Sequence, residues 1–172
     1  MGRADLSAQA AIVIADIYVK QDNPDLGLEA YKDILSKYPN LTGIIYPKIA
    51  GIYYNLGNYS QAVEFYRKGL DLVPIKQIAS VQLRIAESLE AQGKTPDAIE
   101  EYLKVPYLYA DSQALAVKAL LRVGQIYEAK EEFKEAQDIY EKVISLNTEE
   151  AKYAQERIDW IKKNALPGNL RK

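Results

Sequence analysis

Cysteine and histidine are both absent from this chain of 172 residues. Without cysteine there can be no disulfide, no thiolate metal ligand and no thiol nucleophile. Without histidine the chain lacks the commonest general base and the commonest ligand of transition metals. The two absences leave the compartment open, because a cysteine-free chain suits both the cytosol and an oxidising envelope.

Long apolar runs and a strong net charge are missing as well. No stretch approaches the roughly 18 to 20 consecutive apolar residues of a membrane-spanning helix. The formal net charge is −2 and the pI about 5.4, so no general attraction to nucleic acid or to an anionic membrane is expected. We therefore predict no nucleic-acid partner and no direct membrane insertion.

Motifs that carry catalysis are not found either. The nine glycines form no phosphate-binding loop, no calcium loop and no turn that presents a nucleophilic serine. Neighbouring acids such as Glu100 and Glu101 point about 100° apart on a helix and do not converge on one substrate atom. We expect a protein that is not an enzyme and needs no cofactor or metal.

A frame of four residues, by contrast, recurs four times along the chain. It consists of a small residue, an aromatic residue or leucine three places later, a second small residue and then a tyrosine. The copies are Ala15, Tyr18, Gly27, Tyr31; Ala50, Tyr53, Ala62, Tyr66; Ala86, Leu89, Ala98, Tyr102; and Gly124, Tyr127, Ala136, Tyr140. The second small residues lie 35, 36 and 38 positions apart, which is the period of stacked helical hairpins.

This frame resembles the tetratricopeptide repeat. The best copy reads Tyr46, Ile49, Ala50, Tyr53, Leu56, Gly57, Tyr59, Ala62, Tyr66, Gly69, Pro74. The resemblance implies an all-α, right-handed α-solenoid of four helical hairpins with a C-terminal capping helix. The hairpins are expected at about 6–39, 42–74, 75–110 and 112–148, the capping helix at 149–165 and a tail at 166–172, all within one structural domain. The style of the repeats is similar to bacterial cell-envelope members of the family, which favours the periplasm or envelope and a place in a longer protein.

Apolar spacing at the helical period predicts nine helices joined by short turns. They are expected near 6–21, 24–37, 42–55, 59–72, 75–91, 95–105, 112–129, 132–146 and 149–164. Pro106 should end or kink the sixth helix near Val105, because proline lacks an amide donor. The turn of the fourth hairpin, at residues 130–132, consists of good helix formers, so one long helix over 112–146 is the alternative by propensity; the repeat register favours a break.

The last helix should begin after Asn147 or Thr148, both acceptable N-caps. One stripe of small and apolar residues along it should cap the solenoid. Tyr153, Arg157 and Trp160 form a neighbouring stripe, and we expect Trp160 either at the edge of the buried face or in contact with a partner.

First-helix residues that the repeat register turns toward the concave surface are the candidate binding site. The predicted groove consists of Tyr54, Asn55, Leu83, Arg84, Glu87, Lys118, Leu121, Arg122 and Gln125. Lys118 and Arg122 match a pair that holds a terminal carboxylate in some relatives, whereas Pro47 and Gly51 stand where those relatives have a lysine and an asparagine. A solvated row of basic residues with acidic neighbours remains the alternative for these positions.

The resemblance implies a non-enzymatic scaffold or adaptor that binds a peptide or protein in this groove. Two alternatives stay open. Helical repeats of about this length can bind RNA, although the acidic pI opposes it, and solenoid ends can stack on one another to form oligomers.

Overall fold

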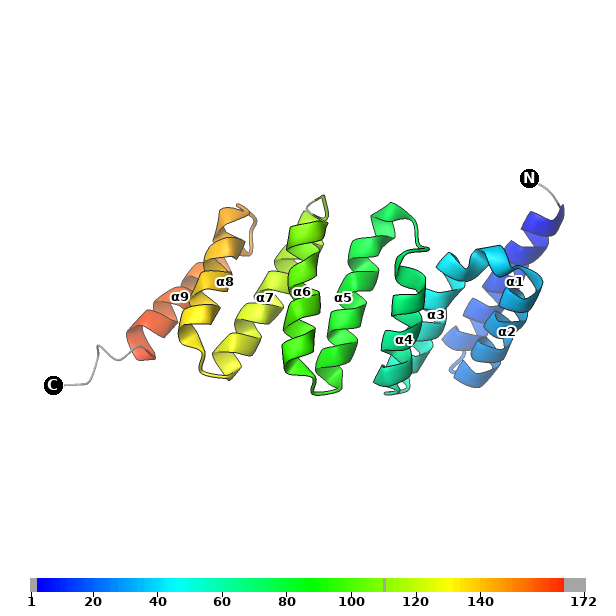
Figure 1. The fold of residues 1–172 in the computed structure, drawn as a ribbon, viewed down its shortest axis with the longest axis horizontal. Helices are drawn as coiled ribbons and strands as arrows, with labels where there is room; N and C mark the ends of the chain where they lie inside the picture. The colour runs from blue at the N-terminus through cyan, green and yellow to red at the C-terminus, as the bar shows by residue number, and fades with distance from the viewer. Residues whose placement is uncertain (1–2, 110, 166–172) are drawn as a thin grey trace. The chain divides into compact units, whose positions relative to one another are not determined.

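The computed structural model describes residues 3–109 and 111–165, and the predicted tail lies outside them. Within that part of the chain every regular element is helical, and no strand occurs. The predicted all-α fold is confirmed (Figure 1). The elements are α1 (Arg3–Lys20), α2 (Pro24–Lys37), a 3₁₀ turn (Pro39–Leu41), α3 (Thr42–Asn55), α4 (Tyr59–Leu70), α5 (Ile75–Ala91), α6 (Thr95–Leu108), α7 (Gln113–Ala129), α8 (Phe133–Ser145) and α9 (Ala151–Asn164).

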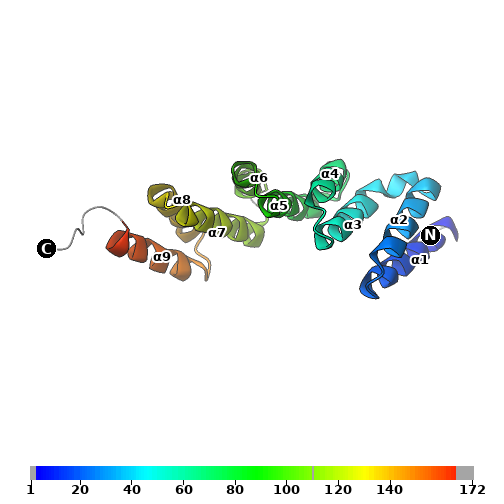
Figure 2. The same ribbon diagram turned by 90° about the horizontal axis from the view of Figure 1, so that it is seen from below.

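The helices form two compact units, residues 1–92 and 93–172. In the first unit α1 packs on α2, α3 on α4, and α4 on α5; in the second, α6 packs on α7, α7 on α8, and α8 on α9 (Figure 2). The division falls at the turn between α5 and α6, within the predicted third hairpin. That hairpin and the single predicted domain therefore remain predictions.

Small residues of the frame lie where helices approach closely. Ala15, Ala50, Ala62, Ala98 and Ala136 have no exposed surface. A methyl group built on Gly124 would lie 2.6 Å from the ring of Tyr140, so the last copy needs glycine at this position. The frame tyrosines Tyr31, Tyr66, Tyr102 and Tyr140 are all at most 5% exposed and supply much of the buried volume.

The four hairpin turns share one backbone conformation. Asp22, Gly57, Gly93 and Glu131 each have φ between 60° and 76°, the left-handed conformation that ends many helices. The amide after this residue donates back to the carbonyl of the frame aromatic residue in three copies, for example from Glu132 to Tyr127 at 2.9 Å. The predicted break in the fourth hairpin is confirmed, and it is made without glycine.

Two sequence expectations about helix ends are wrong. Helix α6 continues through Pro106 to Leu108, because a proline in the last turn removes only one hydrogen bond of the helix. Helix α9 begins at Ala151 after an N-cap at Glu150. Asn147 instead adopts φ 52° in the turn that follows α8.

Helix α9 covers the end of the second unit. Ala154, Ile158 and Ile161 are at most 2% exposed and form the face that packs on α8. Trp160 is 44% exposed, and the guanidinium of Arg157 lies 4.8 Å from the centre of its ring. The tryptophan therefore lies at the edge of the buried face.

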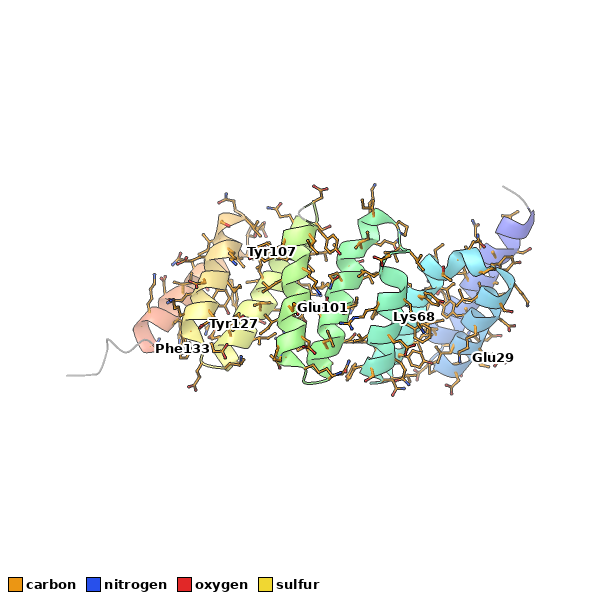
Figure 3. All side chains as sticks on the ribbon, in the orientation of Figure 1. Glu29, Lys68, Glu101, Tyr107, Tyr127 and Phe133 are labelled. Atoms are coloured by element: carbon orange, nitrogen blue, oxygen red, sulfur yellow. The ribbon has the colours of Figure 1, made fainter. Side chains whose placement is uncertain are left out.

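Exposed aromatic surface also occurs where α6 ends. Tyr107 and Leu108 are 63% and 65% exposed, so these two side chains lie on the surface. Lys142 of α8 donates a hydrogen bond of 2.6 Å to the Tyr107 hydroxyl, and Figure 3 labels this tyrosine on α6. No helix among the described residues is both long and apolar enough to span a bilayer.

Candidate binding surface

Three side chains from three helices meet in the first unit. Lys48 of α3 donates to both carboxylate oxygens of Asp16 on α1, at 2.8 and 3.0 Å. The hydroxyl of Tyr31 on α2 donates to the same carboxylate. Burial by itself would raise the pKa of Asp16, but the hydrogen bonds from Lys48 and Tyr31 outweigh it and lower the pKa below its ordinary value. This carboxylate is held ionised by its neighbours.

Predicted groove residues of the first unit form a second cluster. The guanidinium of Arg84 lies 6.0 Å from the ring centre of Tyr54, within the range of a cation–π contact. Arg84 also donates a hydrogen bond of 2.9 Å to Glu87, one turn along α5. The structure thus brings Tyr54, Arg84 and Glu87 together, while Asn55 is exposed at the end of α3.

Leu83 does not behave as the groove prediction requires. Its side chain is only 3% exposed, so it cannot serve as an apolar anchor on the surface. The physical reason is that α5 is buried around much of its circumference, with Gln82, Ile85 and Ala86 buried beside it. Leu83 is therefore a core residue.

Four predicted groove residues lie in the second unit, all on α7. Lys118 and Arg122 are exposed, and Leu121 and Gln125 are half-buried. Arg122 donates to the side-chain oxygen of Gln125 at 3.1 Å, and the Gln125 amide approaches the Tyr153 hydroxyl at 3.4 Å. These contacts join the predicted row on α7 to the capping helix.

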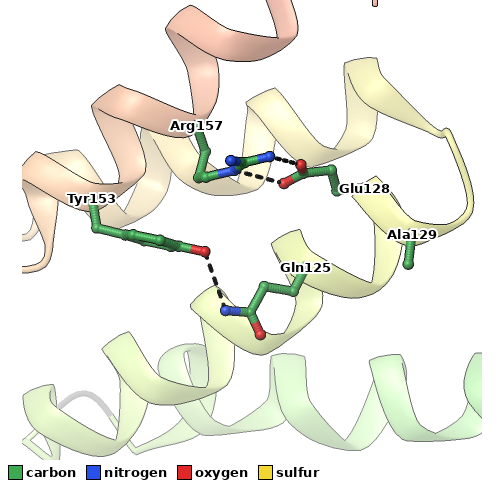
Figure 4. Close-up of a pocket in the computed structure, with 5 residues that line it drawn as sticks. All are labelled: Gln125, Glu128, Ala129, Tyr153 and Arg157. Atoms are coloured by element: carbon green, nitrogen blue, oxygen red, sulfur yellow. Dashed lines mark hydrogen bonds and ion pairs between the residues drawn. The ribbon is translucent and has the colours of Figure 1, made fainter.

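An open pocket of about 310 Å³ adjoins this row, between α7 and α9. Figure 4 shows its lining, which consists of Gln125, Glu128, Ala129, Tyr153 and Arg157. Arg157 donates two hydrogen bonds to the carboxylate of Glu128. The Tyr140 hydroxyl donates a third at 3.0 Å, and burial together with this carboxylate raises the pKa of Tyr140.

The charged groups of the pocket, Arg157 and Glu128, already neutralise one another. Among the described residues no three acidic side chains gather as a metal ligand set would. The stripe of Tyr153 and Arg157 on the last helix is visible in the sequence. Its pairing with Glu128 is not, because 29 residues separate Arg157 from Glu128.

The repeat identity is supported by comparison with known families. Two tetratricopeptide-repeat family models match residues 13–41 and 45–74. Within these two segments the resemblance to the tetratricopeptide repeat is confirmed. The model of the soluble NSF attachment protein family matches residues 74–156. No match is found among the curated proteins.

Solved structures of tetratricopeptide-repeat type share the fold. MamA is 21% identical over 87% of this chain and 83% of its own, with a TM-score of 0.67. A tetratricopeptide repeat protein from Parabacteroides merdae is 17% identical over 92% of this chain and 61% of its own, with a TM-score of 0.73. The apo form of RapI is 12% identical over 91% and 63%, with a TM-score of 0.71. At these identities the likeness establishes the α-solenoid fold alone.

Proposed function

We propose that this tetratricopeptide-repeat chain is a non-enzymatic scaffold that binds a peptide or protein partner on its first helices. The observation that carries the proposal is the surface cluster of Tyr54 and Arg84, in which an aromatic ring lies beside an arginine whose side chain is 53% exposed. Tyrosine and arginine are the residue types that contribute most often to binding energy at protein interfaces. Proteins of this family are generally scaffolds without catalytic activity.

The second unit carries a candidate surface of its own, formed by Lys118, Leu121, Arg122 and Gln125. The half-buried Leu121 supplies apolar area, and the exposed Lys118 and Arg122 supply positive charge. A mixture of apolar anchors and arginine is common at the centre of interfaces. A role in a bacterial cell-envelope assembly belongs to the same proposal and rests on the style of the repeats.

The test is capture of partners from the envelope and soluble fractions of the source organism on the immobilised full chain. A specific partner should be retained by the parent, lost with Tyr54→Ala and retained with Glu64→Gln, a change on α4 at an exposed ion pair with Lys68. Melting temperatures of both variants control for unfolding. Retention of the same partner by all three proteins would contradict the proposed surface.

Self-association is a second candidate, because α1 carries an exposed apolar face. Leu6, Val13, Ile14 and Ile17 are between 45% and 56% exposed, and contiguous apolar surface of this kind often marks an interface. Light scattering across a concentration series should show a dimer that Val13→Lys dissociates. A monomer at all concentrations would exclude this candidate, whereas RNA binding has no such supporting observation.

A further inference from the structure

In the charged cluster described above, the first two copies of the repeat differ in chemical type at one position. In the first copy the cluster consists of Asp16, which follows the first small residue of the frame, Tyr31, which ends the frame, and Lys48, two residues before the next small residue. The same positions in the second copy are Gly51, Tyr66 and Arg84. The tyrosine and the basic residue are retained, and the carboxylate is missing.

The place of that carboxylate is open in the second copy. A Cβ atom built on Gly51 meets one atom within 4 Å, the hydroxyl oxygen of Tyr66 at 3.7 Å. The other copies of the frame have Asp16, Glu87 and Gln125 at this position. Glycine thus leaves room for a Cβ atom at a position where the other copies carry a polar side chain.

Tyr66 points to the same conclusion independently. It is 5% exposed, yet among the described residues the structure records no hydrogen bond for its hydroxyl. The hydroxyl lies within electrostatic reach of Arg84 and Glu87 on α5, and burial raises its pKa. The hydroxyl lies beside Gly51 and can donate one hydrogen bond, so an acceptor group that enters there would have a donor ready for it.

We propose that an aspartate or glutamate side chain of a protein partner enters the space beside Gly51 and accepts hydrogen bonds from Tyr66 and Arg84. It would take the place that Asp16 takes in the first copy. This inference rests on the proposed scaffold function and names the chemistry of the partner group. Gly51, Tyr66 and Arg84 all belong to the first unit.

The charges around the site favour the binding of one carboxylate and limit its affinity. Arg84 has five N–H donors and uses one of them on Glu87, while its side chain remains 53% exposed. Donors therefore remain for an incoming carboxylate. Glu87 repels that carboxylate, so removal of its charge should strengthen binding.

The first experiment asks whether the site accepts a carboxylate, without any partner. Gly51→Asp and Gly51→Asn are compared in the parent and in Arg84→Gln. The two residues have similar helix propensity, and any repulsion between the new charge and the helix end is common to both backgrounds. We expect the Asp variant to gain melting temperature over the Asn variant at pH 7, and most of this gain to disappear with Arg84→Gln and below about pH 4. An Asp-over-Asn difference that is the same in both backgrounds would overturn the proposal.

The second experiment identifies the ligand group by NMR at the Gly51 amide. The probe is N-acetylglutamate N′-methylamide, and the controls are the glutamine analogue and N-acetyl-alanyl-alanine, whose only carboxylate is terminal. We expect a saturable shift with the glutamate probe that is lost with Gly51→Asp and with Arg84→Gln and that becomes several-fold tighter with Glu87→Gln. Equal shifts with the glutamine analogue, a response to the terminal carboxylate only, or no saturation in Glu87→Gln would each refute it.

Neither experiment uses a captured partner. A negative result here leaves the scaffold proposal standing, because a partner could bind elsewhere on the first helices. Failure to capture any partner would instead count against the scaffold and would not change the response to the glutamate probe.

Discussion

Arg157 of α9 donates two hydrogen bonds to the carboxylate of Glu128 on α7, although the residues are 29 positions apart. Their side chains are 28% and 16% exposed, so the pair is screened from water more than an ordinary surface pair. The contact joins the capping helix to the last hairpin at a second point, beside the apolar face that packs on α8.

Replacement of this arginine should therefore weaken the attachment of the capping helix α9 to α7. We expect Arg157→Met to lower the free energy of unfolding by about 1–3 kcal/mol, between the values typical of exposed and of buried ion pairs. Lys68→Met breaks the exposed pair with Glu64, whose side chains are 49% and 57% exposed, and should cost much less, because water and salt screen such a pair. Urea titrations of both variants measure the difference, and equal losses would show that the pair contributes no more than surface charge.

Asp16 should make the stability of the protein depend on pH in the acidic range. Its pKa is lowered in the folded protein from the ordinary value of 3.8, so the folded state binds this proton less readily than the unfolded state. The stabilisation is complete above about pH 5 and is lost as the pH falls through 3.8 and below. Asp16→Asn should cost about 1–2 kcal/mol at pH 7, and the deficit should shrink toward pH 3. A deficit independent of pH would mean that packing, not charge, is lost.

Two glycines of α3 should respond to alanine in opposite ways. A Cβ on Gly43 would lie 2.1 Å from the backbone oxygen of Leu72, so Gly43→Ala must displace the chain after α4. We expect a loss of about 3 kcal/mol from overpacking. Gly51→Ala meets only an ordinary contact at 3.7 Å and should gain about 0.5–1 kcal/mol from helix propensity. Thermal unfolding followed by circular dichroism tests both signs.

The left-handed residue of the hairpin turns offers a matched pair of variants. Glu131 has φ 60°, a conformation that costs a residue with a side chain about 1 kcal/mol. Glu131→Gly should therefore raise the melting temperature by a few degrees. Gly57 has φ 75° and would place a Cβ in open space, so Gly57→Ala should lower it by a similar amount through the backbone alone. The turn geometry is wrong if both changes have the same sign.

Substitutions in the predicted groove should affect either stability or binding, depending on whether the side chain is buried or exposed. Leu83→Ala should cost about 2–5 kcal/mol of stability, as for other buried leucines. Leu121→Ala and Arg122→Ala affect more exposed positions and should reduce the affinity for a captured partner with a smaller change in melting temperature. Glu64→Gln and Lys142→Gln on second helices are the controls. If affinity falls only in proportion to melting temperature, the row on α7 is not a binding surface.

Much of the fold could be predicted from local pattern. The frame of small residues and tyrosines predicted the helix pairs, and all nine helices of the described residues begin within three residues of their expected starts. The largest difference is at the first helix, which begins at Arg3. The local pattern failed at two helix ends. At Pro106 it predicted the end of a helix, but the last turn of a helix tolerates proline. At Asn147 it predicted an N-cap, but this residue lies in the turn before the helix.

The candidate site could be predicted only in part, and the residues show why. The repeat register placed Tyr54, Arg84 and Glu87 on one surface, because residues at equal register lie at equivalent places on successive first helices. It could not foresee that Leu83 is buried, since exposure depends on which other helices cover α5. It also did not reveal the contact of Arg157 with Glu128, which requires α9 to pack beside α7.

By itself, then, the sequence determined the class of fold and the absence of cysteine and histidine chemistry, because helix periodicity, repeat spacing and composition are local properties. The tertiary structure alone decided which polar groups find partners. Asp16 accepts hydrogen bonds from Tyr31 and Lys48, while the hydroxyl of Tyr66 lies beside Gly51, which has no side chain to accept one. The two copies share the same frame, and one absent side chain separates a closed cluster from an open one, because hydrogen bonds form between atoms that meet in space.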